Sequence, residues 1–444
     1  MHILKGYTKQ EISWMMYDWA NSAHSVIIVT LLPIFFDTVA GYTADSVSSM
    51  STWGYATSIA MLIVALAAPF LGVFGDIRGM RKKLFSFFML LGVAACAGMA
   101  FTPGMDFNSG PVAAGKVASL ILVLYIVSVI GFDASAIYYD AFLTDVTTED
   151  RMDKVSTMGY GLGYIGGSTI PLLIFLIMNL VGVPMLTCLA VVFGLTAVWW
   201  LAFSLPLLKN CEQTSGKPYE KGDVARSIKG VGTTIKEIIA NKPMLIYILS
   251  YFFYIDGVHT VISMATTYGT NLGLDSTGMM LALLLVQILG LPFCLLYIKC
   301  SEKFGARTMV GFGICVYMFI CIFAFFMNSL WQFWVLAVLC ATSQGGIQAL
   351  SRSMFGKLIP DKSRSGEFFG FYDIFGKFSA IIGPSLVGLT STVAYNVIAA
   401  QGAVTDPAAL EAMSAPWGVL SILIIFLIGG GAYFFVLPKY MKKK

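Results

Sequence analysis

Twelve apolar runs, each long enough to cross a bilayer as a helix, divide this chain into six spans, a polar stretch and six more spans. A hydrocarbon core of roughly 30 Å takes about 20 helical residues. The runs fall near residues 14–38, 52–75, 82–101, 117–141, 155–180 and 184–206, and then near 243–270, 276–298, 306–327, 331–351, 367–392 and 416–438. Only 12% of the residues are charged and 57% are hydrophobic, so lipid must solvate much of the surface. The sequence predicts an all-α membrane protein with 12 transmembrane helices.

The lysines and arginines lie on one side of these spans. The segments after the second, fourth, sixth, eighth and tenth runs, together with both termini, hold nearly all 28 of them. The alternate segments carry Lys116 and several acids. Cytoplasmic loops hold such an excess of cations, so we predict that both termini are cytoplasmic. The expected location is the cell (inner or plasma) membrane, or the vacuolar membrane if the source is a fungus.

The polar stretch in the middle separates two halves of similar size. We expect an N-terminal six-helix bundle over residues 1–206, a cytoplasmic linker over 207–242 and a C-terminal six-helix bundle over 243–444. Within the linker, apolar residues from Val224 to Ile238 recur at spacings of three and four. This spacing predicts an amphipathic helix, lying either on the inner membrane surface or against the protein.

Two tight turns after matching spans repeat a pattern of an acid, a glycine and cations. The residues are Asp76, Arg78, Gly79 and Arg81 after the second run, and Glu302, Lys303, Gly305 and Arg307 after the eighth. The glycine permits the turn and the cations anchor it at the inner face. The pattern resembles the loop motif of the major facilitator superfamily. That resemblance implies two pseudo-symmetric six-helix bundles, with these turns belonging to the gate and loop machinery.

Four other segments resemble one narrower family. They are the segments 17–22, 256–263, 351–360 and 367–370, which begin Tyr-Asp-Trp-Ala-Asn-Ser, Asp-Gly-Val-His-Thr, Ser-Arg-Ser-Met-Phe and Glu-Phe-Phe-Gly. Their order and composition are similar to those of the unknown major facilitator family, the relatives of the fungal autophagy-related vacuolar amino-acid effluxer. The resemblance implies amino-acid efflux, although a fold transfers between relatives more readily than a cargo does.

Polar side chains follow one face of the first and seventh spans. These residues are Asp18, Asn21 and Ser22 in the first span, and Asp256, His259 and Thr260 in the seventh. A charge at the bilayer centre is costly unless it is paired or hydrated. One interpretation is that both faces line a central cavity and bind substrate or protons. The other is that each aspartate pairs with a neighbouring helix or caps a broken turn.

Three other spans carry ionisable groups. Asp133 and Asp140 lie on one face of the fourth span; Asp133 is a cavity candidate, and Asp140, near the predicted inner mouth, is a gating candidate. Arg352 takes the place in the tenth span that Asp140 takes in the fourth. A charge pair between them across the cytoplasmic gate is one hypothesis, and a local pair is the alternative. Lys377 follows Asp373 by four residues, the favourable order for an intrahelical pair; facing the cavity instead, it would hold a substrate carboxylate.

Motifs for catalysis, ATP hydrolysis and metal binding do not occur in the sequence. It contains no GxxxxGK[ST] loop, no HExxH helix and no GxSxG elbow. Its 8 cysteines and 3 histidines show no metal-ligand spacing. We therefore predict that the chain is no enzyme and needs no cofactor or metal, and that an ion or substrate gradient supplies the energy for its work.

The sequence predicts a secondary transporter that moves a small amphipathic solute by alternating access. An amino acid in the efflux direction is the expected cargo, and protons are the candidate coupling ion. The expected partners are the lipid bilayer, the small-molecule substrate and protons, with no nucleic acid, and we expect a monomer. Two alternatives stay open: an exporter of organic cations or drugs, and a non-transporting membrane receptor or scaffold on the same fold.

Overall fold

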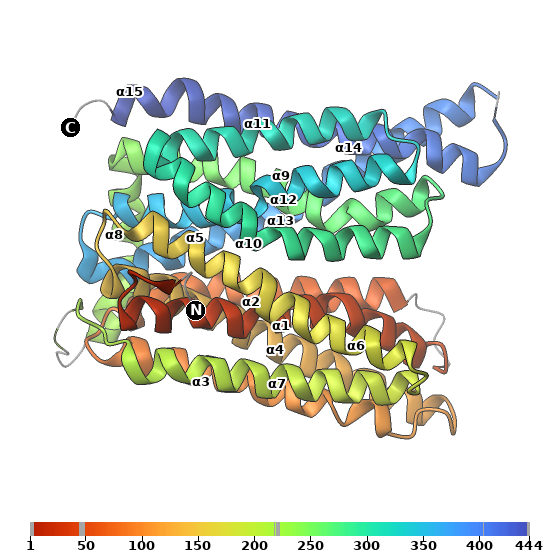
Figure 1. Ribbon diagram of the computed structural model, residues 1–444, viewed down its shortest axis with the longest axis horizontal. Coiled ribbons are helices and arrows are strands. Elements are labelled where there is room, and N and C mark those ends of the chain that lie inside the picture. Colours follow the sequence, from red (N-terminus) through yellow and green to blue (C-terminus); the bar gives the residue numbers. More distant parts are fainter. Residues whose placement is uncertain (1–3, 44–48, 217, 219–222, 403, 442–444) are drawn as a thin grey trace. The chain divides into compact units, whose positions relative to one another are not determined.

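The structure, a computed structural model, describes residues 4–43, 49–216, 218, 223–402 and 404–441 (Figure 1). Within these residues, 12 helical spans are long and apolar enough to cross a membrane, which confirms the predicted number and the all-α class. The spans are α1 (Lys9–Ala40), α2 (Ser49–Gly75), α3 (Met80–Met99), α4 (Pro111–Val146), α5 (Met152–Gly163) with η3 (Tyr164–Thr169) and α6 (Ile170–Leu180), α7 (Met185–Asn210), α9 (Lys242–Asn271), α10 (Ser276–Phe304), α11 (Ala306–Phe325), α12 (Leu330–Leu358), α13 (Ser365–Ala400), and α14 (Pro407–Gly431) with η5 (Ala432–Val436) and α15 (Leu437–Met441).

Several helices extend beyond the apolar runs that predicted them. The run near 14–38 lies inside α1, which begins at Lys9. It begins there because the Thr8 hydroxyl accepts a hydrogen bond from the Glu11 N–H, and the Glu11 carboxylate accepts one from the Thr8 N–H. Asp275 caps α10 in the same way by accepting from the Gly278 N–H. A helix continues through polar residues until a cap satisfies its first N–H groups, so apolar length alone places the start of α1 too far inside, whereas it places the start of α10 correctly at Ser276.

The glycines of the two repeated turns have the left-handed conformation that the pattern predicts. Gly79 has φ 80° and Gly305 has φ 84°, values that cost a side-chain-bearing residue free energy and cost glycine little. Gly79 ends the turn between α2 and α3, and Gly305 separates α10 from α11. Both matching segments therefore turn at a glycine with positive φ, although ψ differs, at −3° for Gly79 and 147° for Gly305.

The helices group into two compact units, and each is described by itself. Unit 1 comprises residues 1–155, 162–231 and 361–371, and unit 2 comprises residues 156–161, 232–360 and 372–444. Each unit thus includes a short segment from the sequence half that supplies most of the other. The start of α13 belongs to unit 1 and the rest of α13 to unit 2. The division of the sequence at 206 and 243 stays a prediction.

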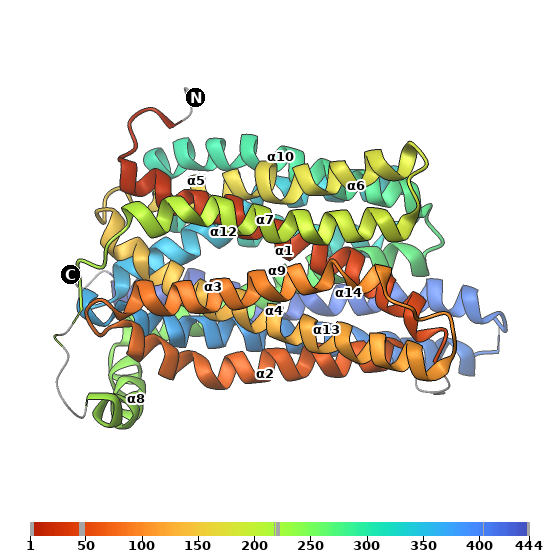
Figure 2. The same ribbon diagram turned by 90° about the horizontal axis from the view of Figure 1, so that it is seen from below.

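In unit 1, α4 packs against α1, α2 and α3 (Figure 2). The α3–α4 crossing is closest where two glycines meet. A Cβ atom added to Gly131 of α4 would lie 2.5 Å from the Gly92 nitrogen and 2.6 Å from the Gly92 Cα of α3. Small residues allow such backbone contact between membrane helices, so this pair sets the distance between α3 and α4.

In unit 2, α9 packs against α12 and α14, and α12 also packs against α10 and α11 (Figure 1). Three aromatic rings stack where α9, α12 and α13 come together. The Tyr372 ring lies 4.2 Å from the Tyr251 ring and 4.6 Å from the Phe355 ring, centroid to centroid. Stacked aromatic rings bury much apolar area in a defined geometry, so they hold these three helices in register.

The predicted amphipathic helix forms α8 (Asp223–Ala240). Thr234 is fully buried and Ile238 is 5% exposed, whereas Ile235 and Ile239 are 44% and 50% exposed. One face of its second half therefore packs against the protein, as one of the two interpretations expected. The side chains of residues 223–230 lie outside the described ones, and placement on the membrane surface stays a prediction.

Candidate functional site

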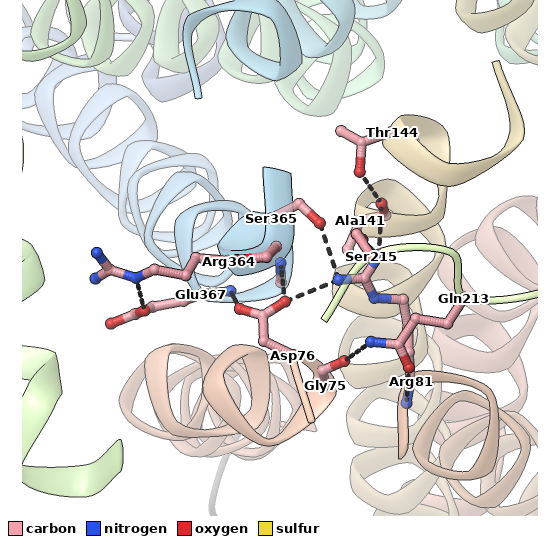
Figure 3. Close-up of polar contacts among 12 residues, drawn as sticks. Gly75, Asp76, Arg81, Ala141, Thr144, Gln213, Ser215, Arg364, Ser365 and Glu367 are labelled. Atoms are coloured by element: carbon pink, nitrogen blue, oxygen red, sulfur yellow. Dashed lines mark hydrogen bonds and ion pairs between the residues drawn. The ribbon is translucent and has the colours of Figure 1, made fainter. Parts of the chain in front are cut away.

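Asp76, in the turn after α2, caps the beginning of α13 within unit 1 (Figure 3). Its Oδ1 accepts hydrogen bonds from the Gly366 N–H at 2.7 Å and the Arg81 Nη2 at 2.8 Å. Its Oδ2 accepts from the Glu367 N–H at 2.8 Å. The first N–H groups of a helix have no partner inside it and attract negative charge. A carboxylate distant in sequence therefore supplies the cap that the start of α13 needs.

Arg81 is fully buried and holds this cluster together. Its guanidinium forms ion pairs with Asp76 and Asp145, and donates to the Ala141 carbonyl at 3.2 Å and the Ser365 Oγ at 2.9 Å. Burial raises the pKa of Asp76 to about 7, although Arg81 and the two backbone amides favour the charged carboxylate. The charge on Asp76 therefore depends on these partners.

The first residues after α7 bind to the same turn, which the sequence did not indicate. Asp145 Oδ1 accepts from the N–H groups of Thr214 and Ser215 at 3.1 and 2.9 Å. Gln213 Oε1 accepts from the Gly79 N–H at 2.9 Å. The beginning of the predicted linker is thus attached to the α2–α3 turn. Asp145 lies in an acid-containing stretch without any pattern that would have distinguished it.

The other predicted gate residues near the turns have more exposed surroundings. Arg78 is exposed, as are Glu302 and Lys303. The Lys303 ammonium lies 5.1 Å from the centroid of the Phe304 ring, and Arg307 is half-buried at the start of α11. The two repeated turns therefore share a glycine with positive φ, but the first buries its acid and the second exposes it.

A second missed cluster surrounds Glu11, which is 1% exposed. Arg151 donates to both of its carboxylate oxygens at 2.7 Å, and the Thr147 hydroxyl donates to Oε1 at 2.7 Å. Fork-to-fork pairs of this kind are among the stronger hydrogen-bonded ion pairs. The cluster ties the start of α1 to the connection between α4 and α5.

The polar residues of the first span face other helices of unit 1. Asp18 is 8% exposed, and its Oδ2 accepts from the Tyr139 hydroxyl at 2.7 Å. Asn21 is also buried. The Ser22 hydroxyl donates to the Asp18 carbonyl at 2.6 Å, and a Cβ on Gly163 would lie 2.6 Å from that hydroxyl. Ser22 thus packs against α5, and Asp18 has a partner on α4.

Asp133 and Asp140 of α4 and Arg352 of α12 are the other charged candidates within the spans. Asp133 is 3% exposed and Asp140 is half-buried. Arg352 donates from Nε to the Ser156 Oγ at 3.0 Å, and its guanidinium lies 4.6 Å from the Tyr160 ring centroid. The hypothetical pair of Asp140 and Arg352 joins residues of different units and stays a prediction.

Asp256 of α9 is fully buried in unit 2. Its Oδ1 accepts from the Gly383 N–H of α13 at 2.9 Å and from the Thr260 hydroxyl at 3.4 Å. The contact with Thr260 confirms that these two residues share a face of α9. The bond from Gly383 joins Asp256 to a neighbouring helix, as one of the two interpretations expected, and Pro384 follows Gly383 inside α13.

Charged and polar side chains of α9, α12 and α13 lie close together near Asp256 and Thr260. Lys377 Nζ lies 3.6 Å from Asp373 Oδ1, and these side chains are 16% and 19% exposed. His259 of α9 interacts electrostatically with Lys377 and hydrogen-bonds with Gln348 of α12. This group, which we call the α9–α12–α13 polar cluster, contains His259, Gln348, Asp373 and Lys377. It combines a cation and an anion inside membrane-spanning helices.

Twelve apolar spans in two six-span halves, with a tight turn at matching places, define the fold of the major facilitator superfamily. The fold is similar to that of an outward-facing bacterial homologue of the iron transporter ferroportin, with TM-score 0.67, 16% identity and coverage of 98% of this chain and 99% of that one. It is also similar to the proton:xylose symporter XylE, with TM-score 0.68, 15% identity and 94% coverage of each chain. At such identities the likeness shows the fold alone.

The chain belongs to the family described as vacuole effluxer Atg22 like, whose model matches residues 39–399. An uncharacterized MFS-type transporter of Bacillus subtilis, YxiO, is 41% identical over 435 residues, which cover 96% of this chain and 94% of that protein. Autophagy-related protein 22-1 of Penicillium rubens is 25% identical over 53% of this chain and 44% of its own length. These findings confirm the predicted family and a multi-pass membrane protein, an MFS-type transporter rather than an enzyme.

Proposed function

We propose that this MFS-type transporter exports an amino acid by alternating access, with the α9–α12–α13 polar cluster as its binding site. The observation that carries the proposal is the ion pair of Lys377 with Asp373. Ionisable groups inside membrane spans are rare and mark substrate or ion pathways. Both members of this pair keep some exposed surface, so a solute can reach them.

The pair suits a zwitterion for a physical reason. At 3.6 Å the contact is looser than a short charge-assisted hydrogen bond. A zwitterionic amino acid can replace one ion pair by two, with its carboxylate on Lys377 and its ammonium group on Asp373. The exchange adds no net charge to the membrane interior, where an unpaired charge is costly. Gln348 and His259 would supply further hydrogen bonds to the carboxylate.

The same geometry argues against Asp256 as the group that holds the substrate ammonium. Asp256 is fully buried, whereas Asp373 is 19% exposed. The efflux direction rests on the family, whose name describes vacuole effluxers, and on the gradient-driven energetics that the sequence predicts. Lys377 disfavours an organic cation without a carboxylate, because like charges would meet in the site.

The test is the thermal stability of the purified protein in detergent with amino acids, small peptides, sugars and organic cations. A ligand at about 100 times its Kd stabilises the fold by roughly 2.7 kcal/mol. We expect stabilisation by particular amino acids in the wild type, lost in Lys377→Gln and in Asp373→Asn. Lys299→Gln is the matched control, because Lys299 is an exposed lysine of α10 in the same unit.

Other outcomes would replace the proposal. Stabilisation only by cations that lack a carboxylate, unchanged in Lys377→Gln, would indicate an exporter of organic cations. Stabilisation by amino acids that persists in both cluster variants would move the site elsewhere. No response to any solute would remove the support for amino-acid transport and favour a receptor or scaffold.

A further inference from the structure

One oxygen of Asp256 has no hydrogen-bond partner among the residues that the structure describes. The Oδ1 atom accepts from the Gly383 N–H and the Thr260 hydroxyl, whereas the buried Oδ2 atom accepts from neither. No described cation forms an ion pair with this carboxyl group. A buried carboxylate without a counter-ion is strongly disfavoured, and a protonated carboxyl group is not. The surroundings of Asp256 therefore favour a bound proton.

The Oδ1 side of Asp256 packs tightly against α13. Asp256 has no exposed surface. A Cβ atom added to Gly383 would lie 2.7 Å from Asp256 Oδ1 and closer still to Thr260 Oγ1. A single carbon atom therefore already clashes between this carboxyl group and Gly383. A proton adds a charge without adding volume.

The other titratable groups of unit 2 interact with residues other than Asp256. On α9 itself, the Tyr254 hydroxyl bonds with Ser351 and His259 interacts with Gln348 and Lys377. The charged residues and tyrosines of unit 2 on the elements around α9 are Tyr372, Asp373, Lys377 and Tyr395 on α13, Arg352 and Lys357 on α12, Arg307 and Tyr317 on α11, Tyr297, Lys299, Glu302 and Lys303 on α10, Glu411 on α14, Tyr433 on η5, and Lys439 and Tyr440 on α15. None of these acts on Asp256 among the interactions found for it, which come only from Gly383 and Thr260.

The partner of Asp256 lies next to a proline inside α13. In a regular helix the Gly383 N–H would bond to the carbonyl four residues earlier. Pro384, the next residue, has no N–H, and its ring crowds the carbonyl of residue 380, so a proline inside a helix favours a bend there. The Gly383 N–H beside this proline donates to Asp256. Any change in the position of this carboxyl group thus acts directly on the bend in α13.

We propose that Asp256 is the proton-carrying residue of this transporter and that its proton occupancy is coupled to the bend of α13 at Gly383 and Pro384. The inference rests on the proposed function, because a coupling proton needs a transport cycle. Loading forms an O–H bond on Oδ2 and neutralises the carboxylate, which stays buried against Gly383. Release breaks that O–H bond and returns the proton to water. The carboxylate then needs hydration, so α9 and α13 separate at Gly383.

The test is an infrared titration of the carboxyl carbonyl stretch in purified protein between about pH 5 and pH 8. We expect the band of a protonated buried carboxyl group to persist near neutral pH in the wild type. The Asp256 part of the band should be lost in Asp256→Asn, an uncharged isostere of the protonated side chain, and the difference spectrum separates it from the buried Asp76, whose pKa is about 7. It should stay in Asp373→Asn, which changes the ion-paired acid of the polar cluster. If Asp256→Asn fails to fold, Asp256→Glu should shift the frequency of the band. A wild-type spectrum without the band, or one unchanged in Asp256→Asn, would overturn the proton site.

A second pair of variants tests the coupling to α13. In Gly383→Ala the new Cβ displaces the carboxyl group and breaks its bond with the backbone N–H of residue 383, which favours the charged carboxylate; the band should therefore titrate at a different pH from that of the wild type. Gly388→Ala, on the same helix, is the matched control, because a Cβ at Gly388 meets nothing within 4 Å. Equal titrations in both variants and the wild type would contradict the coupling. The infrared measurement can be made without knowing the transported solute. If the protein binds amino acids but lacks the Asp256 band, the proton site is refuted and the proposed cargo stands. If the Asp256 band is present but no amino acid binds, the proposed cargo is refuted and the proton site stands.

Discussion

Replacing Arg81 by alanine should cost about 3–5 kcal/mol of folding free energy, because it leaves two buried carboxylates without their cation. Arg81 is 0% exposed and pairs with both Asp76 and Asp145. It also donates to the Ala141 carbonyl and the Ser365 hydroxyl, which would lose their partner. Denaturant titration of the purified protein in detergent measures the loss. The unfolding free energy of Arg81→Lys should lie between those of the wild type and Arg81→Ala, because an ammonium group restores the charge without the planar fork of the guanidinium.

The control for this prediction lies three residues away. Arg78 is in the same turn but exposed, so Arg78→Ala should change the unfolding free energy by less than about 0.5 kcal/mol. Removing the acids together with the arginine, as Arg81→Met with Asp76→Asn and Asp145→Asn, should recover part of the loss. Equal stability of Arg81→Ala and Arg78→Ala would show that the buried cluster does not hold the turn.

Gly131→Val should be the most damaging glycine substitution in α4. Its Cβ would lie 2.5 Å from the Gly92 nitrogen and 2.7 Å from the Phe88 carbonyl oxygen. These atoms belong to the backbone of α3 and cannot rotate away, so the two helices must move apart. Overpacking a well-filled site typically costs 1–3 kcal/mol or more, and we expect the upper part of that range at about 3 kcal/mol. Thermal unfolding in detergent is the measurement.

Gly115 offers a matched comparison on the same helix. A Cβ at Gly115 meets nothing within 4 Å, and alanine is a better helix former than glycine by about 1 kcal/mol. Gly115→Ala should therefore leave the stability unchanged or raise it slightly. A Gly131→Val protein as stable as Gly115→Ala would mean that α3 and α4 do not touch at this crossing.

The sequence predicted the features that depend on short-range patterns. Apolar length predicted the 12 spans, and an acid–glycine–cation repeat predicted two turns whose glycines have positive φ. The spacing of Asp256 and Thr260 predicted their shared face. Each of these features is set by residues within about two helical turns, where helical geometry alone relates side chains.

The partners of the buried charges could not be predicted in this way. Asp76 meets Gly366 and Glu367 across nearly three hundred residues, and the groups involved are backbone amides. Every residue except proline carries such an amide, so no residue type marks the position. Likewise, nothing near Glu11 indicated Arg151 as its partner. A carboxylate at the end of a span shows that a partner is needed, while the tertiary fold decides which one.

The central claim is that this chain moves amino acids across a membrane through the site at Lys377. The most direct measurement is the efflux of radiolabelled amino acids from proteoliposomes preloaded with a proteinogenic mixture. We expect wild-type proteoliposomes to lose particular amino acids faster than protein-free liposomes do. Lys377→Gln proteoliposomes should lose them only at the protein-free rate, and Lys299→Gln should match the wild type. Equal efflux from wild-type and protein-free vesicles for every amino acid would contradict the account.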